Sequence, residues 1–169
     1  MKLASTILTS TKSVKLMDTP ELSKWAIYTH PTTPTYISCF PYPCALIGDA
    51  AHAQSPFQGS GAGQAIEDAL ILSHVLGLIT SPSGIPAAFQ AYDSVRRPRG
   101  DKAVRTSEEA GELIGLQEEM VERVGGLEGV GRELGGRMEW LWGADIGGMV
   151  GEVEGRFKQI LGGQGVGET

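Results

Sequence analysis

The hydrophobic and polar positions of this chain follow two different periods, and the change comes near residue 60. Before it, short apolar runs at 22–28, 36–40 and 44–48 predict β-strands, separated by prolines that disfavour helix. The run at 44–48 contains no charged residue, so we expect this strand to be buried on both faces. Residues 1–20 have a weak pattern that we interpret as a short helix and a loop.

After residue 60 the apolar residues recur at a helical spacing. The clearest helix is predicted over 63–79. Its predicted apolar face consists of Ala62, Ile66, Ala69, Leu70, Ser73 and Leu76, and its polar side of Gln64, Glu67, Asp68 and His74. A second helix is predicted from Pro86, with an interruption or a kink at Pro98 and a helical continuation over 99–116.

The last third of the chain is predicted to be helical but weakly stable, because glycines recur within its helical pattern. Trp140, Leu141 and Trp142 form an apolar group that we expect to pack against another element. Residues 162–169 are predicted to lack fixed structure.

Composition and charge exclude several function classes. The 169 residues have a formal net charge of −6, which argues against a nucleic-acid-binding surface, because such a surface needs clustered Lys and Arg. One dense group of basic residues lies in a predicted helix beside acidic residues, and we interpret it as a solvent-exposed face. This group consists of Arg96, Arg97, Arg99, Lys102 and Arg105.

The sequence also argues against membrane and extracellular classes. No stretch approaches the roughly 20 apolar residues of a membrane span, and the first residues have no continuous apolar core of a signal peptide. The two cysteines, Cys39 and Cys44, are not expected to form a disulfide. We therefore expect a soluble, cytoplasmic protein with no membrane partner.

Asp49 is the first candidate for chemistry, because it directly follows the apolar run that ends at Gly48. Ligands of α/β proteins bind where strands end, so this carboxylate is placed to accept a hydrogen bond from a sugar or ribityl hydroxyl. The alternative is that Asp49 caps the short turn 50–52. Position alone does not decide between them.

Three glycines, Gly59, Gly61 and Gly63, precede the predicted helix over 63–79. Glycine leaves the main chain open to a ligand, and the free N–H groups at a helix start attract negative charge. The spacing differs from the dinucleotide motif G-x-G-x-x-G, because position 64 is Gln, and from the nucleophile motif G-x-S-x-G. The alternative interpretation is a flexible loop.

His52 and Pro56 lie between these two features. His52 is more typical of a histidine that packs and hydrogen-bonds locally than of a general acid or base. The three histidines are 22 residues apart and have no cysteine partner nearby, so no metal site is predicted. Pro56 fixes the shape of the loop or serves as a simple turn residue.

Several motifs taken together are specific. They are G-D-A-A-H-A at 48–53, Pro56, G-S-G-A-G-Q-A at 59–65, I-E-D-A at 66–69, A-Y at 91–92, R-R-P-R at 96–99, and W-L-W with Asp145. This set resembles the C-terminal FAD-binding segment of the class A flavin monooxygenases, in particular the salicylate-hydroxylase-like group of fungal secondary metabolism. The resemblance covers about residues 20–160.

The resemblance implies an α/β fold: a partial FAD-binding domain with short strands followed by C-terminal helices. It implies that Asp49 binds the ribityl chain of FAD and that the main chain of Gly61, Ala62 and Gly63 runs along the flavin ring. Gly59 belongs to the same cofactor-binding loop, and Pro56 borders the flavin and substrate pocket. The implied activity is hydroxylation or epoxidation of a small organic substrate with NAD(P)H and O2. No catalytic residue is assigned.

The sequence departs from the family in what it lacks. The N-terminal β-α-β unit with G-x-G-x-x-G and the middle D-G motif are not found in these residues. We therefore expect a truncated form, with residues 1–40 as a remnant of the substrate domain, 41–100 as the FAD-binding segment, and 101–169 as C-terminal helices and tail.

Three alternatives for function stay open. The chain can complement a separate N-terminal half, act as a non-catalytic interaction module, or work as a cofactor-free isomerase or cyclase. The last would need an acid–base pair, for which the candidates are His52 with Asp49 or Glu67 with Asp68, although the latter two look like helix surface.

Overall fold

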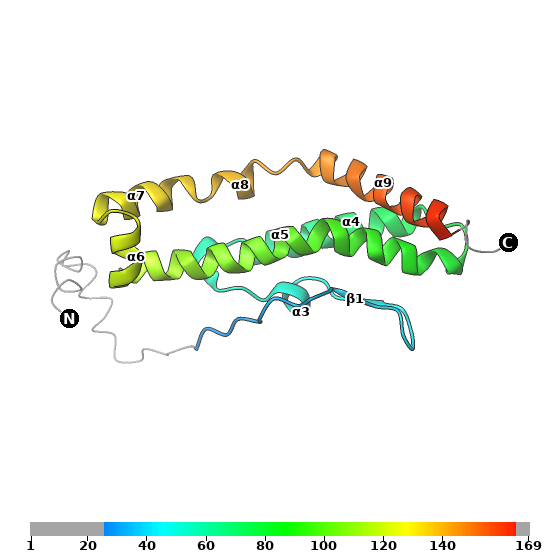
Figure 1. Cartoon of the computed structure of the whole chain (residues 1–169), viewed down its shortest axis with the longest axis horizontal. Helices are drawn as coiled ribbons and strands as arrows, with labels where there is room; N and C mark the ends of the chain where they lie inside the picture. The colour runs from blue at the N-terminus through cyan, green and yellow to red at the C-terminus, as the bar shows by residue number, and fades with distance from the viewer. Residues whose placement is uncertain (1–25, 165–169) are drawn as a thin grey trace.

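The computed structural model describes residues 26–164 (Figure 1). The expectations for residues 1–20 and for 165–169 lie outside the described residues. Of the strand predicted over 22–28, the described residues 26–28 form no strand, and the Ile27 and Tyr28 side chains are exposed. That part of the prediction is wrong, because no neighbouring strand pairs with this segment. Residues 162–164, predicted to be unstructured, belong to the last helix.

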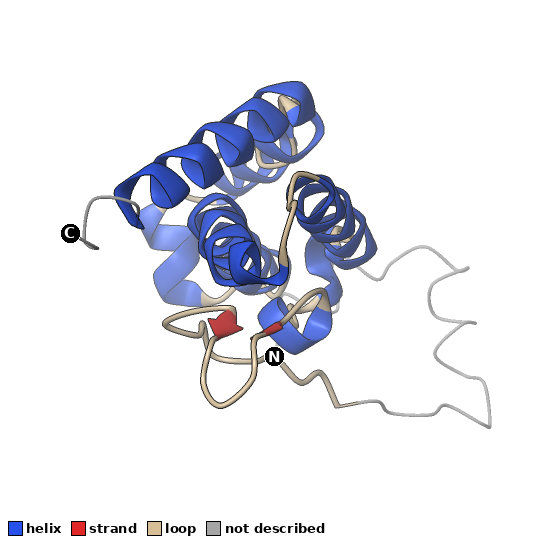
Figure 2. Cartoon of the chain, turned by 90° about the vertical axis from the view of Figure 1, so that its right-hand side faces the viewer, coloured by secondary structure: helices blue, strands red, loops and turns tan. Residues whose placement is uncertain are grey.

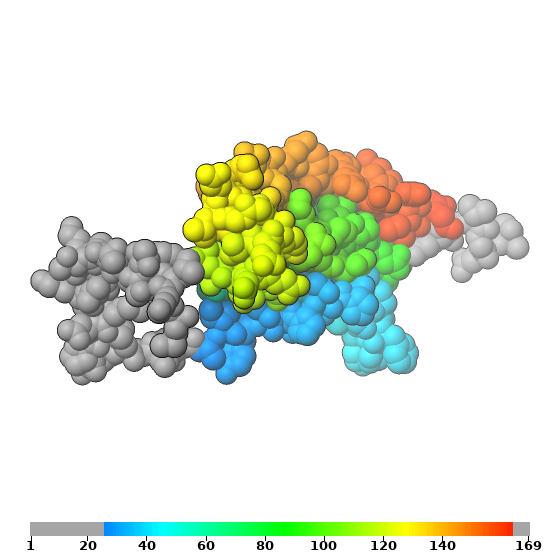
Figure 3. Space-filling view, turned by 60° about the vertical axis from the view of Figure 1, so that its left-hand side comes forward, coloured from blue at the N-terminus to red at the C-terminus, as the bar shows by residue number. Residues whose placement is uncertain are grey.

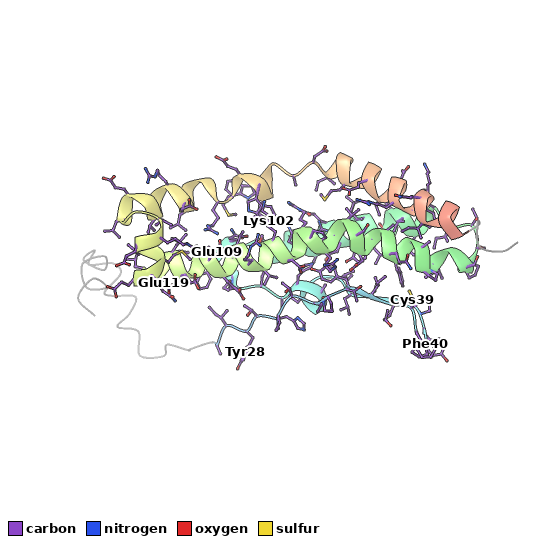
Figure 4. The ribbon with its side chains drawn as sticks, viewed as in Figure 1. Tyr28, Cys39, Phe40, Lys102, Glu109 and Glu119 are labelled. Carbon is purple, nitrogen blue, oxygen red and sulfur yellow. The ribbon has the colours of Figure 1, made fainter. Side chains whose placement is uncertain are left out.

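The sheet consists of one small antiparallel hairpin. Strand β1 (Ile37–Ser38) pairs with β2 (Cys44–Ala45), with Ile37 opposite Ala45. The hairpin projects from the helical body (Figures 1 and 3), and Phe40 lies at its tip (Figure 4). Both cysteines are free and exposed. The expectation that 44–48 is buried on both faces is wrong: only Gly48 is buried, because no second layer covers the outer side of β2.

After the hairpin, the described chain is mostly helical. Its elements are α3 (Asp49–His52), the 3₁₀ turn η1 (Pro56–Gln58), α4 (Gly61–Gly77), the 3₁₀ turn η2 (Pro82–Gly84), α5 (Ile85–Ile114), α6 (Glu118–Arg123), α7 (Leu127–Gly136), α8 (Glu139–Trp142) and α9 (Ile146–Gln164). Helix α5 runs through Pro98 without a break, and it also crosses residue 100, where we divide the chain. The division stays a prediction.

Helices α4, α5 and α9 lie side by side and enclose the main core (Figures 1 and 2). Alanines on α5 allow its neighbours to approach closely. The buried residues of this core are Tyr36, Ala51, Ile71, Val75, Ala87, Ala88, Ala91, Tyr92, Val95, Val153 and Phe157. A smaller cluster of Leu113, Met120 and Val130 holds α6 and α7 against the end of α5. In residues 26–164, no helix has both the length and the apolarity needed to cross a membrane.

The segment with two tryptophans packs only in part, as an aromatic anchor for α5. Leu141 is buried, and Trp140 lies under the charged ends of Arg99 and Lys102, at 5.1 and 4.2 Å from the ring centroid. Figure 4 shows Lys102 reaching from α5 toward α8. Trp142 is 80% exposed, so the expectation that it packs is wrong.

Candidate functional site

The turn at Gly48–Asp49 depends on the backbone conformation of Gly48. Gly48 has φ 58° and is the N-cap of α3, and its carbonyl accepts hydrogen bonds from Ala51 N and His52 N, both at 2.9 Å. Helix α3 begins at Asp49 itself, so the interpretation of Asp49 as the cap of this turn is wrong. The Asp49 side chain is exposed. Its carboxylate is thus presented to solvent from the first turn of a helix.

The glycine loop brings the other predicted residues to the start of α4. Pro56 opens the η1 turn, Gly59 closes it with φ 60°, and α4 begins at Gly61. The Gln54 amide satisfies both of its polar atoms when its oxygen faces this start: it then accepts from Gly61 N at 2.7 Å and donates to Ala103 O at 3.0 Å. The loop is therefore fixed against α5 and is not a freely flexible glycine segment.

The start of α4 leaves backbone donors available. The first N–H groups of an α-helix have no acceptor within the helix, which here applies to Ala62 and Gly63 beyond the bond of Gly61 to Gln54. Ala62 and Gly63 are exposed, and a Cβ added at Gly59 or Gly63 would meet no atom within 4 Å. The surface in front of the helix start is open, so a polar ligand can reach the main chain.

A buried carboxylate, Asp68, connects the two parts of this site. Its Oδ2 atom accepts a hydrogen bond from Gly48 N at 2.9 Å and lies 2.5 Å from His52 Nε2. Its Oδ1 atom accepts from Arg96 Nε at 2.8 Å. Asp68 and Arg96 are both 0% exposed. The Asp68 carboxylate therefore connects the Gly48–His52 turn, α4 and α5 by hydrogen bonds.

The Arg96 guanidinium is fully engaged. It donates to Glu67 Oε2 at 2.6 Å, and to the main-chain and side-chain oxygens of Gln64 at 3.2 and 3.0 Å. Arg99 also binds Glu67, at 2.6 and 2.8 Å, and reaches the carbonyls of α8. The interpretation of this basic group as a solvent-exposed face is wrong for Arg96, because two carboxylates on α4 face it.

The same finding corrects the predicted faces of α4. Gln64 and Asp68, expected on the polar surface, are buried, whereas Ile66 and Leu70, expected on the buried face, are 70% and 43% exposed. The helix is rotated from the predicted orientation: its inner side carries the ion pair with α5 in its N-terminal half, and the buried Ile71 and Val75 in its C-terminal half.

Two opposing effects set the pKa values of the paired carboxyl groups. Burial alone would raise the pKa of Asp68, but hydrogen bonds from His52, Gly48 N and Arg96 leave it below its usual value. Burial also acts on Glu67, and hydrogen bonds and charge from Arg99 and Arg96 leave its pKa lowered. Both groups are therefore held as carboxylates within the fold.

His52 is a packed histidine, as the sequence suggested. It is 2% exposed, and its ring lies 5.9 Å from the Tyr36 ring, between α3 and α5. It contacts Asp68 and not Asp49, so the pair suggested for cofactor-free acid–base chemistry does not form. Glu67 and Asp68 are occupied by arginines, which removes the second suggested pair.

Of the predicted site residues, Pro56, Gly59, Gly61, Ala62 and Gly63 lie in the η1 turn and the start of α4, and the turn that carries Asp49 is bonded to α4 through Gly48 N and Asp68. Sequence reasoning missed Gln54, and it missed the supporting roles of Asp68 and Arg96. A signal for the last two was present, because an acidic pair and a basic cluster both interrupt apolar helical patterns. Their pairing across 28 residues requires the fold.

Comparisons with known proteins show to which family this chain is related. Residues 43–107 match a family model described as an FAD binding domain. The chain is 42% identical over 135 residues to 6-methylsalicylate 1-monooxygenase from Aspergillus terreus, covering 80% of this chain and 29% of that protein. It is 41% identical over 128 residues to a salicylate hydroxylase from Pseudomonas putida, covering 75% of this chain and 28% of that protein.

A solved structure of a salicylate hydroxylase in complex with substrate has the same fold. It superimposes with a TM-score of 0.59 at 39% identity, over 72% of this chain and 28% of that one. The chain thus spans about three tenths of the length of its relatives, and a mostly helical body with a short antiparallel sheet is what this part of the α/β fold contains. Over the part that it spans, this chain therefore belongs to the family of FAD-dependent monooxygenases that includes the salicylate hydroxylases.

Proposed function

We propose that this chain supplies part of the flavin site of an FAD-dependent monooxygenase acting on a small organic substrate. The observation that supports this most strongly is that the turn with the exposed Asp49 carboxylate is bonded to α4, whose own start is open. An acceptor for hydroxyl groups and main-chain donors for an electron-rich ring edge are the two features that a flavin with its ribityl chain requires.

The residues of this region fit the cofactor. In this proposal Asp49 accepts hydrogen bonds from the ribityl hydroxyls, and the main chain of Gly61, Ala62 and Gly63 lies along the flavin ring. Gly59 keeps the loop free of side-chain atoms. Its backbone has φ 60°, which would be strained for a residue with a Cβ. Pro56 borders the side on which the substrate binds.

The chemistry divides between cofactor and protein. Bound FAD supplies hydride acceptance from NAD(P)H and activation of O2 for transfer of one oxygen atom to the substrate. The protein residues bind and orient the ring, and the N–H groups at the start of α4 favour the negative charge that a flavin carries on reduction. The fungal monooxygenases among the relatives support a role in secondary metabolism. A cytoplasmic location stays a prediction.

The missing contacts to the cofactor must come from outside residues 26–164. We propose that the outer face of α4 binds the part of the monooxygenase that carries them, either in one longer chain or as a separate N-terminal half. This face exposes Ile66 and Leu70, and the neighbouring strand end exposes Leu46 and Ile47. Burying such apolar groups against a partner is favourable at about 25 cal/mol per Å².

Neither alternative class is favoured. A cofactor-free isomerase needs an accessible acid–base pair, but His52 is buried and bonded to Asp68. A purely structural interaction module would not need an exposed carboxylate beside an open helix start.

The test is the visible absorbance spectrum of the purified chain, recorded with FAD after unbound flavin is removed. A retained flavin band, or saturable binding in a titration to high FAD concentration, supports the proposal, and the absence of both contradicts flavin binding by these residues. Because these residues are proposed to bind only the riboflavin part of the cofactor, FMN and riboflavin should bind about as well as FAD. A strong preference for FAD would mean that these residues also hold the adenosine part.

A further inference from the structure

The four-residue turn α3 is held at both ends by one atom. Asp68 Oδ2 accepts the hydrogen bond of Gly48 N, which precedes the turn, and contacts His52 Nε2, which ends it. Asp49 lies between these two contacts. The backbone at Asp49 is therefore held between two residues that both contact the Asp68 carboxylate.

The carboxylate itself is fixed from the opposite side. Arg96 holds Asp68 Oδ1, and its remaining donors are bound to Glu67 and Gln64 on the same helix. Arg96 therefore cannot rotate away without breaking several hydrogen bonds. The turn, α4 and α5 are connected by charged hydrogen bonds, which are stronger than neutral ones.

Stability alone does not explain this arrangement. A buried ion pair is often no more stabilising than apolar side chains of similar volume, which would hold α4 against α5 equally well. Apolar side chains could not accept from Gly48 N or bind His52. The distinctive property of the Asp68–Arg96 pair is thus control over the turn that carries Asp49.

We propose that Asp68, held by Arg96, is a positioning residue for the flavin site, which keeps the Gly48–His52 turn in the conformation that presents Asp49. This inference rests on the proposed function, because a ligand at Asp49 gives the turn its role. Asp68 does not touch the ligand in this account and acts only through the turn.

The test compares amide hydrogen exchange in the full chain, in Asp68→Asn and in Val153→Ala. Arg96 and the turn bind different oxygens of Asp68, and asparagine has an NH2 donor in place of one of them, so it cannot accept from both. Val153 lies in the core on α9 and serves as the control for general destabilisation. We expect exchange at Gly48, Ala51 and His52 to accelerate roughly tenfold or more in Asp68→Asn beyond the change in core amides. The same pattern in both variants would overturn the proposal.

A second variant keeps the test decisive if Asp68→Asn does not fold. The contacts of Asp68 with Gly48 and His52 form a clamp on the turn. His52→Phe removes one end of this clamp and leaves the Asp68–Arg96 pair in place. It should accelerate exchange within the turn, and unchanged exchange there would overturn the proposal.

Flavin binding by the same variants separates the two claims. If the wild-type chain binds flavin, Asp68→Asn should bind it more weakly than Val153→Ala does, and equal binding would overturn the positioning role. If the wild-type chain binds no flavin, the proposed function fails, whatever the exchange data show.

Discussion

Over residues 64–70, the two faces of α4 reverse the usual order of a surface helix, whereas farther along the helix Ile71 and Val75 are buried in the apolar core. The inner face, against α5, carries Gln64 and Asp68 in a buried network of charges and hydrogen bonds. The outer face carries Ile66 and Leu70, both exposed to solvent. Helices on protein surfaces normally bury their apolar side and expose the polar one.

This difference shows which contacts are already made and which are still required. On the inner face, the donors of Arg96 and the oxygens of Asp68 have partners within the described residues. The outer face has the composition of a buried surface. The proposed flavin region lies at the N-terminal end of this helix, where its main chain is open.

The largest expected effect comes from breaking the inner face. In Arg96→Met, Asp68 stays buried without its cationic partner, and removal of one member of a buried ion pair costs about 3–5 kcal/mol in the free energy of unfolding. Chemical denaturation of the two proteins measures it. The matched control is Arg105→Met on the exposed side of α5, which should stay within about 0.5 kcal/mol of wild type. Equal losses in both variants would contradict a special role for Arg96.

A second experiment compares two isoleucines on opposite faces of the same helix. Ile71→Ala removes a fully buried side chain and should cost about 2–5 kcal/mol in the free energy of unfolding. Ile66→Ala removes an exposed one and should change it by about 0.5 kcal/mol or less. Thermal or chemical unfolding measures both. A large loss for Ile66→Ala would mean that the outer face is already covered in the chain.

A smaller effect is expected where α5 approaches the turn. A Cβ at Gly100 would lie 2.5 Å from Tyr36 Oη and 2.9 Å from His52 Cδ2, both buried. Gly100→Ala should therefore lower the free energy of unfolding by about 1–3 kcal/mol. Gly135→Ala, on α7 with no atom near the added Cβ, should raise it by up to about 1 kcal/mol. Changes of the same sign in both variants would contradict this packing.

The last prediction concerns the pH dependence of the free energy of unfolding, which should be small near neutral pH and appear only in acid. The pKa values of Asp68 and Glu67 are lowered by folding, so their contribution is present above the unfolded-state values, near about 4, and is lost as pH falls through the folded-state values. Denaturation curves measured from pH 7 downward should show stability falling below about pH 5. Asp68→Asn should flatten this fall, and an unchanged pH dependence would exclude Asp68 as a source.

Much of this fold follows from the sequence, and the exceptions have a physical cause. The helices at 61–77 and from 85 onward agree with the periodicity, as does the start of α4 after the glycine loop. The orientation of α4 does not, because periodicity cannot tell an apolar face packed within this chain from one that stays exposed. The strand at 44–48 was misjudged for the same reason, since its outer side is open.

The candidate site was predictable only in its outer residues. Asp49 and the three glycines carry recognisable local signals, a carboxylate after an apolar run and glycines before a helix. The clamp by Asp68 joins positions 20 and 28 residues apart, and no local pattern determines such a pairing. Charged residues inside an apolar helical pattern are the signal to examine in similar sequences.

The most direct test of this account is a flavin titration of the wild-type chain and Asp49→Ala, followed by the change in flavin fluorescence. Asp49 is exposed, so its replacement should leave the fold intact, which the unfolding curve will confirm. Glu108→Ala on the exposed side of α5 is the control. We predict saturable binding to wild type and control, and binding weaker by roughly tenfold or more in Asp49→Ala. Equal binding by all three proteins, or none by the wild type, would contradict the account.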